Sequence, residues 1–143
     1  MMIRNIHISL CVILIYDLMG NLIDRAIEKS PDIHIAALNS GSDWHTQNTL
    51  KLVDAQVQWL ENDIKASQAK WKIVFIHQGV YPAKEERAFG LRDSLEKTLQ
   101  DNGVDLVLQG HDHMIGRTYP MRDGEPVSKE THESIEKGEG IVY

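Results

Sequence analysis

Three histidines stand at or shortly after the ends of short apolar runs of this chain. His77 follows Lys72–Ile76, and His111 and His113 follow Val104–Leu108 with a glycine before the first and one residue between the two. Neutral imidazole is the commonest protein ligand for the borderline first-row transition metals. If these rings meet in the fold, the sequence predicts a metal site. Two ligands one residue apart on a turning loop can also be directed at two adjacent ions.

The elements around these histidines predict that they meet. Both apolar runs are short and rich in β-branched residues, which indicates buried strands. Between them, Glu86–Gln100 carries leucines four positions apart, as on one face of a helix. A strand–helix–strand unit makes its two strands parallel, so both carboxyl ends lie at one edge of the sheet. In open α/β sheets this edge is where ligands bind. A lone histidine here would more often be a loop or core residue, and the metal reading therefore depends on the whole set.

The remaining pattern extends the α/β arrangement. Asp32–Leu38 nearly alternates and predicts a strand, with His34 on the face opposite its isoleucines. Residues 53–64 have apolar positions at helical spacing and predict an amphipathic helix of about four turns. Asp123-Gly124 is a strong hairpin signal. The chain is therefore expected to alternate strands and helices up to that hairpin.

The amino-terminal segment differs from the rest, and we treat residues 1–31 as an atypical unit before residues 32–143. The apolar run Ile6–Tyr16 lacks a cleavage-site pattern after it and is too short to span a bilayer, so a buried strand is expected. Asp24–Ser30 is expected to form a short helical turn that ends before Pro31, because the residue preceding proline disfavours the α region.

Composition limits the function classes. A chain of 143 residues with 42% hydrophobic content corresponds to one globular domain. A net charge of −6 without a basic run argues against a nucleic-acid surface. One cysteine excludes an internal disulfide and a cysteine-rich zinc site. No membrane span and no protein partner are evident, and the cellular compartment stays open.

Several of these stretches together resemble a known family. The runs Trp71–Tyr81, Val104–His113 and Arg117–Pro120 look like the second half of a calcineurin-like metallophosphoesterase, and they are most similar to its purple acid phosphatase-like branch. Leu38–Ser40 and Gln58–Glu61 match that branch too, so the likeness covers about Asp32 to the end. The resemblance implies an α/β two-sheet sandwich flanked by helices (α/β/β/α), of which this chain would hold a part, its N-terminal part missing.

The resemblance also implies an activity and roles for the histidines. Such enzymes hydrolyse phosphoester substrates with a dinuclear centre of divalent or trivalent transition metals, two of iron, manganese and zinc. The histidines that match His77 and His111 ligate one ion, and the one that matches His113 ligates the other. Asp112 is expected to accept a hydrogen bond from a ring N–H outside the ligand set.

Three further residues are weaker candidates by resemblance. Gly20-Asn21 could be a remnant of the family's Gly-Asn-His signature, which would make Asn21 a metal ligand. Leu22 then stands where the histidine that assists leaving-group protonation should be. Arg117 could contact a phosphate through its planar fork, and Tyr81 is a second substrate-binding candidate.

The departures from the family lower the expected activity. The Gly-Asp-x-x-Asp signature that provides a bridging carboxylate is absent. Two divalent ions a few ångströms apart repel strongly unless such a carboxylate offsets the charge. We therefore expect at most one metal, and a truncated phosphoesterase with impaired catalysis.

Two alternatives stay open. One is a non-catalytic α/β fragment or interaction domain with at most weak metal binding. The other is a mononuclear three-histidine zinc hydrolase, which needs all three rings to face one point. The close spacing of His111 and His113 on one loop disfavours that arrangement.

Overall fold

The structure of the chain is a computed structural model, which describes residues 25–29, 32–38, 54–84, 90–129 and 134–143. The strand expected at Ile6–Tyr16 and the candidate ligand Asn21 lie outside the described residues. The same holds for the first residues of the helix expected at Glu86–Gln100.

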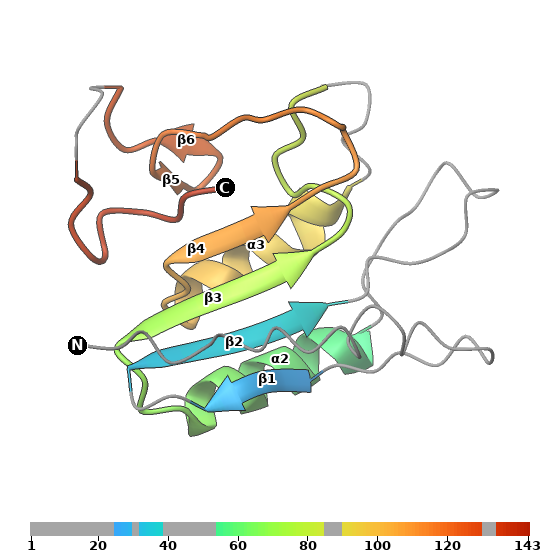
Figure 1. Cartoon of the computed structure of the whole chain (residues 1–143), viewed down its shortest axis with the longest axis vertical. Coiled ribbons are helices and arrows are strands. Elements are labelled where there is room, and N and C mark those ends of the chain that lie inside the picture. The colour runs from blue at the N-terminus through green and yellow to red at the C-terminus, as the bar shows by residue number, and fades with distance from the viewer. Residues whose placement is uncertain (1–24, 30–31, 39–53, 85–89, 130–133) are drawn as a thin grey trace, which may run out of the picture.

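A four-stranded sheet forms the centre of the described fold (Figure 1). Its order is β1 (Arg25–Lys29), β2 (Ile33–Leu38), β3 (Trp71–Ile76) and β4 (Leu106–Gln109). β2, β3 and β4 are parallel, and β1 runs antiparallel at the edge. The strands expected from the apolar runs and their parallel orientation are therefore confirmed.

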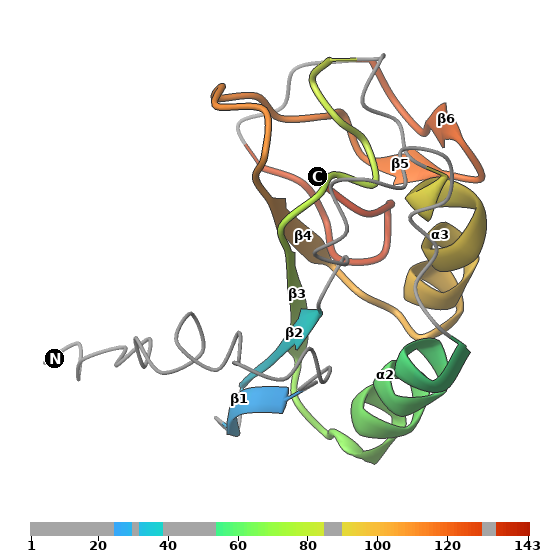
Figure 2. The same cartoon turned by 90° about the vertical axis from the view of Figure 1, so that its right-hand side faces the viewer.

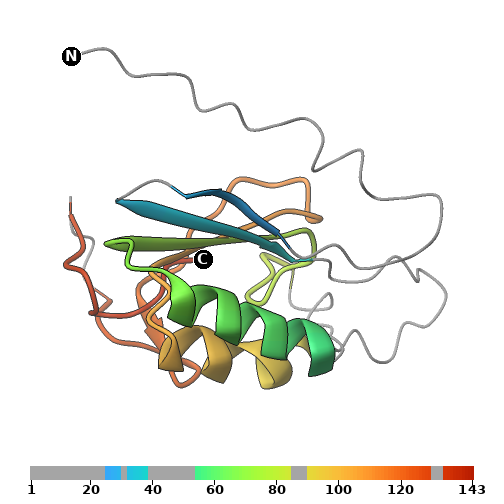
Figure 3. The ribbon, with the colours of Figure 1, turned by 90° about the horizontal axis from the view of Figure 1, so that it is seen from below.

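Two helices cover one face of this sheet. α2 (Asp54–Ala66) and α3 (Leu91–Asp101) lie side by side on the same face (Figures 2 and 3). Buried apolar side chains from the helices and the sheet fill the layer between them, among them Leu60, Leu95 and Val74. The two helices thus form one layer packed on the mixed four-stranded sheet. This α/β arrangement corresponds to part of the expected sandwich.

The helical turn expected at Asp24–Ser30 is wrong, because Arg25–Lys29 is the strand β1. Its backbone pairs with β2 from Arg25 opposite Ala37 to Lys29 opposite His34, with a register shift after Ala26. A single helical turn fixes several dihedral angles for one hydrogen bond, whereas the free edge of β2 offers a ladder of bonds. Long-range pairing with β2 therefore decides which element forms, and Pro31 bears only on where it ends.

The two faces of β2 have different neighbours. His34 lies opposite the isoleucines as expected, but its face is the one beneath the helices, where it is 1% exposed. Its Nε2 atom lies 2.7 Å from Oδ2 of Asp63 on α2. An imidazole buried under a helix needs a polar partner, and Asp63 supplies it. Ile33 and Ile35 are half-buried on the other face.

The carboxyl-terminal part packs beside β4 and α3. A hairpin joins β5 (Met121–Arg122) to β6 (Glu125–Pro126), and the intervening Asp123 and Gly124 have φ angles of 51° and 82°. Both values suit the two-residue turn that Asp-Gly predicts. The last residues join the sheet through bridges from Val142 to β4 and from Ile141 to β5. None of the helices in the described part of the chain has the length and apolarity to cross a membrane.

Candidate metal centre

The parallel register brings the ends of β3 and β4 to one edge of the sheet. Ile76, the last residue of β3, pairs with Gln109, the last residue of β4. One residue beyond each, the Gly110 N–H donates to the His77 carbonyl at 3.0 Å. The two loops that carry the histidines are therefore joined by a backbone hydrogen bond where they leave the sheet.

The imidazoles of His77 and His111 face each other at this edge. His77 Nε2 lies 3.3 Å from His111 Nδ1, and the two ring planes stand at 82° with their centroids 5.2 Å apart. The convergence expected for these two rings is thus confirmed, although 34 positions separate them in the sequence. The side chain of His77 is exposed, so the pair is accessible from solvent.

This spacing fits two ligands of one metal ion. Zinc–nitrogen bonds are about 2.0–2.1 Å long, so two nitrogens on a tetrahedral ion lie about 3.3–3.4 Å apart. The distance of 3.3 Å between His77 Nε2 and His111 Nδ1 matches that separation. The described residues contain no group of three histidine, cysteine or acidic side chains that could hold a metal. The donor set that the structure describes is therefore a two-nitrogen set.

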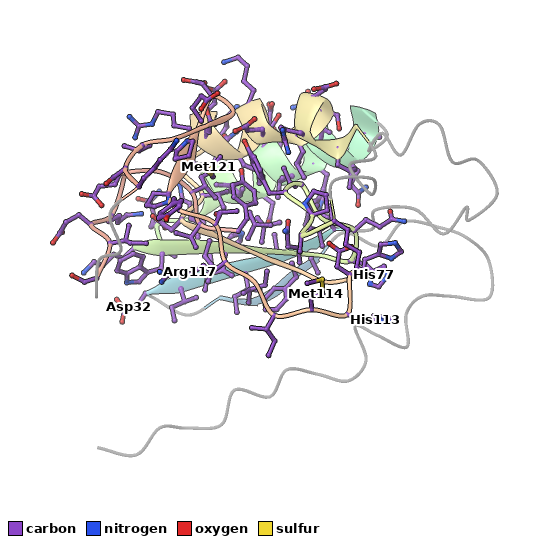
Figure 4. The ribbon with its side chains drawn as sticks, turned by 90° about the horizontal axis from the view of Figure 1, so that it is seen from above. Asp32, His77, His113, Met114, Arg117 and Met121 are labelled. Atoms are coloured by element: carbon purple, nitrogen blue, oxygen red, sulfur yellow. The ribbon has the colours of Figure 1, made fainter. Side chains whose placement is uncertain are left out.

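His113 shares the edge but does not complete a three-ligand group with the pair. Figure 4 shows it at the same edge as His77, with the exposed Met114 beside it. Both histidines of the loop have left-handed backbone, with φ of 72° at His111 and 54° at His113. The role of His113 as ligand of a second ion stays a prediction.

Asp112 is buried between the half-buried His111 and the exposed His113. Its side chain is 6% exposed, and Oδ2 accepts a hydrogen bond from the Lys84 N–H at 3.2 Å. Asp112 thus connects the loop after β4 to the chain that follows His77. Its expected contact with a ring N–H stays a prediction.

The two substrate-binding candidates occupy different surroundings. The Tyr81 hydroxyl donates to Glu96 of α3 at 2.6 Å, and the ring lies 4.6 Å from that of Tyr143. Burial, followed by the hydrogen bond to Glu96, raises the pKa of Tyr81 above its ordinary range. Arg117 is exposed, on the loop between β4 and β5, and lies apart from His77 and His113 in Figure 4. Substrate contacts by Tyr81 and Arg117 stay predictions.

One short sequence match to a metal-binding signature is explained by the fold. Asp32-Ile33-His34 reads as Asp-x-His, a pattern that we did not single out in the sequence. It stands at the amino end of β2, and the parallel register places that end at the edge opposite His77. His34 is also held by Asp63. These residues therefore cannot join the facing pair.

Sequence reasoning gave no role to Gln109, the residue before Gly110. Its side chain accepts hydrogen bonds from the N–H groups of Val80 and Tyr81, at 3.0 and 3.3 Å. Its amide also donates to the Tyr81 carbonyl. Its place next to Gly110-His111 was the only available signal, because its partners lie 28 and 29 positions away.

The described fold is a mostly parallel sheet with helices on one face and two facing imidazoles at its carboxyl edge. The sequence profile of the calcineurin-like phosphoesterases matches residues 13–114, which is more than half of the chain. The chain belongs to this family. The relatives that it matches are purple acid phosphatases.

Those relatives are much longer proteins. Purple acid phosphatase 17 of Arabidopsis thaliana is 37% identical over 70 residues, which are 44% of this chain and 19% of that protein. The probable purple acid phosphatase 20 of the same plant is 30% identical over 93 residues, covering 59% and 20%. The structure of purple acid phosphatase PPD1 from yellow lupin (Lupinus luteus) seeds shares the fold, with a TM-score of 0.61, 18% identity and coverage of 78% and 20%. The chain thus spans about a fifth of the length of these proteins.

Proposed function

We propose that this chain holds a single transition metal ion between His77 and His111, and that the site serves phosphoester hydrolysis. The observation that carries the proposal is the 3.3 Å separation of His77 Nε2 and His111 Nδ1. The two nitrogens are within hydrogen-bond distance of each other, and the same spacing suits two ligands of one ion. Family membership supplies the reaction type.

The ion would contribute the charge stabilisation and the activated water of the reaction, as metal ions do in phosphoester hydrolysis. His77 and His111 would bind the ion and fix its place at the sheet edge. Asp112 and Gly110 would keep the two loops together through their hydrogen bonds to Lys84 and His77. The role of each side chain here is binding and positioning.

A second ion is not part of the proposal. His77 and His111 are neutral ligands, and the sequence has no Gly-Asp-x-x-Asp to bridge two cations. Two uncompensated divalent ions would repel each other by several kcal/mol at such a short distance, about 4 kcal/mol even for unit charges 4 Å apart at the protein surface. We therefore expect weak binding of one ion and slow hydrolysis by the chain alone.

Titration with zinc or manganese tests the proposal. Calorimetry should give one site per chain, and the NMR signals of the His77 and His111 rings should shift together. His77→Ala and His111→Ala should each weaken binding by about 100-fold or more, since loss of a supporting residue alone commonly costs 10–100-fold. Asp101→Asn is the matched control, because Asp101 is an exposed carboxylate on α3 that pairs with Lys97.

The outcomes separate the candidate functions. Unchanged ring signals at saturating metal would overturn the site and favour a non-catalytic scaffold. Metal-dependent hydrolysis of an aryl phosphate at about 1 s⁻¹ or faster, an ordinary enzymatic rate, would refute the expected impairment. Slow hydrolysis that disappears in both histidine variants would support the proposal.

A further inference from the structure

We infer that Gln109 is a positioning residue that sets the separation of His77 and His111. The inference rests on the proposed function for its consequence, metal affinity, but its geometric part concerns the metal-free chain. Gln109 is the last residue of β4, and His111 follows two positions later. Its side chain reaches across to the segment that follows His77 and makes three hydrogen bonds there.

The contacts hold both ends of that segment. The Gly110 N–H is bonded to the carbonyl of His77 itself. The Gln109 amide accepts from the N–H groups of Val80 and Tyr81 and donates to the Tyr81 carbonyl. Gly110 therefore binds the start of the turn from residue 77 to residue 81, and Gln109 binds its end. Moving the backbone of His77 away from the loop that carries His111 would require this turn to move.

Gly79 leaves room for the side chain of Gln109 because it has no Cβ atom. A Cβ atom at Gly79 would lie 3.2 Å from Cδ and Nε2 of Gln109 and 3.1 Å from Cα of Pro82. The missing side chain lets the amide plane of Gln109 lie against the turn. β3 is followed by His77-Gln78-Gly79, and β4 ends in Gln109-Gly110-His111. The side chain of Gln109 packs against Gly79.

The chemistry of an amide suits this task. It presents an acceptor oxygen and donor hydrogens in one plane, so one side chain satisfies two N–H groups and a carbonyl. It is also neutral, so it holds the turn without adding charge beside two imidazoles. Groups that hydrogen-bond to a metal ligand commonly change metal affinity by about 10–100-fold when they are removed. Gln109 acts through the backbone of the same turn, so we expect an effect at the lower end of that range.

A structural role alone would be to satisfy the backbone groups of Val80 and Tyr81. Asp105 provides the matched comparison, because it makes the same kind of link at the other end of β4. Its Oδ2 accepts from the Lys72 N–H at 2.9 Å, and its Oδ1 pairs with Lys137 at 2.6 Å. Asp105→Ala therefore removes a bridge between β4 and β3 far from the histidine edge.

The test compares Gln109→Met with Asp105→Ala in the complete chain. The first reading is the nuclear Overhauser effect between the ring protons of His77 and His111 without metal. The unmodified chain and Asp105→Ala should show it, and Gln109→Met should lose it. The second reading is zinc affinity by calorimetry, which should fall about 10-fold or more in Gln109→Met and stay within about 2-fold in Asp105→Ala.

Gly79→Ala covers the case in which Gln109→Met does not fold. It leaves the glutamine in place and displaces its amide, so it should weaken both the ring contact and zinc binding. The inference is overturned if Gln109→Met keeps both the ring contact and the zinc affinity. If only Gly79→Ala folds, the same result in that variant overturns it. Absence of the ring contact in the unmodified chain overturns it as well. Ring contacts that behave as expected in a chain that binds no zinc contradict the proposed function and leave the positioning role supported.

Discussion

His111 and His113 have backbone conformations that residues with a Cβ atom rarely adopt. Their φ angles are 72° and 54°, and they lie at the edge where the rings of His77 and His111 meet. Left-handed backbone costs an ordinary residue about 1–2 kcal/mol and concentrates at functional sites. Glycine would relieve that cost but would not supply a ring. The presence of histidine at a position suited to glycine favours a role for the side chain.

His111→Gly should therefore be more stable than His111→Ala by about 1 kcal/mol, because both remove the ring and only glycine accepts the left-handed backbone without strain. Urea unfolding of the two variants measures the difference. Both should lose the zinc response to the same degree. Equal stabilities would indicate that residue 111 is not left-handed in solution.

At the scale of elements, the end of the chain is fixed to the hairpin by close backbone approach. The N–H of Ile141 donates to the carbonyl of Met121 at 2.9 Å, and the reverse bond is 2.8 Å long. Gly140 precedes this pair, and a Cβ atom there would lie 2.9 Å from the Met121 carbonyl oxygen and 3.1 Å from its nitrogen. Neither backbone atom can move without opening the bridge between Met121 and Ile141.

Gly140→Ala is accordingly expected to lower the free energy of unfolding by about 2 kcal/mol through overpacking. Gly116→Ala is the control, because nothing lies within 4 Å of a Cβ atom at Gly116 and the change should stay within about 0.5 kcal/mol. Thermal or chemical unfolding of both variants checks the contrast. If Gly140→Ala were as stable as Gly116→Ala, the close pairing of Met121 with Ile141 would be refuted.

At the scale of the whole molecule, Glu96 joins parts that are distant in the sequence. Its Oε1 accepts hydrogen bonds from the Tyr81 hydroxyl at 2.6 Å, from Gln100 at 3.1 Å and from the Gly124 N–H at 3.0 Å. One carboxylate on α3 thus contacts both the loop after β3 and the β5–β6 hairpin. Tyr143 packs against Tyr81 next to this cluster, and its buried hydroxyl has no hydrogen-bond partner among the described residues.

This cluster predicts how stability depends on alkaline pH. Burial raises the pKa of Tyr143, with a further contribution from Glu96, and burial together with the hydrogen bond to Glu96 raises that of Tyr81. As pH rises, the unfolded chain loses these protons first, near the ordinary value of about 10. The contribution of the two protonated tyrosines to the free energy of unfolding is therefore complete below about pH 10 and declines above it.

Tyr143→Phe should flatten that decline, because it removes one of the two shifted groups. Below pH 9 it should leave stability equal or slightly higher, since the hydroxyl that it deletes is buried with no hydrogen-bond partner in the described part of the chain. The measurement is the free energy of unfolding between pH 8 and pH 11 for the two proteins. An identical slope in both would show that Tyr143 does not titrate with folding.

The sequence by itself determined the alternation of strands and helices and the edge on which the candidate site lies. Periodicity identified β2, β3, β4 and most of the two helices, and crossover geometry made the strands parallel. The meeting of His77 with His111 follows from those local and topological rules. The lengths of the apolar runs and the positions of the glycines were sufficient to predict that these two residues meet.

Only the tertiary structure decided the finer placement. The 3.3 Å spacing of two ring nitrogens, the left-handed backbone at His111 and the reach of Gln109 across to Val80 all depend on register between strands far apart in the chain. The strand at Arg25–Lys29 likewise depends on pairing with the edge of β2, which the local sequence did not indicate. Local patterns set which elements form and where they point. Distances are fixed to within a few tenths of an ångström only when long-range hydrogen bonds hold one loop against another.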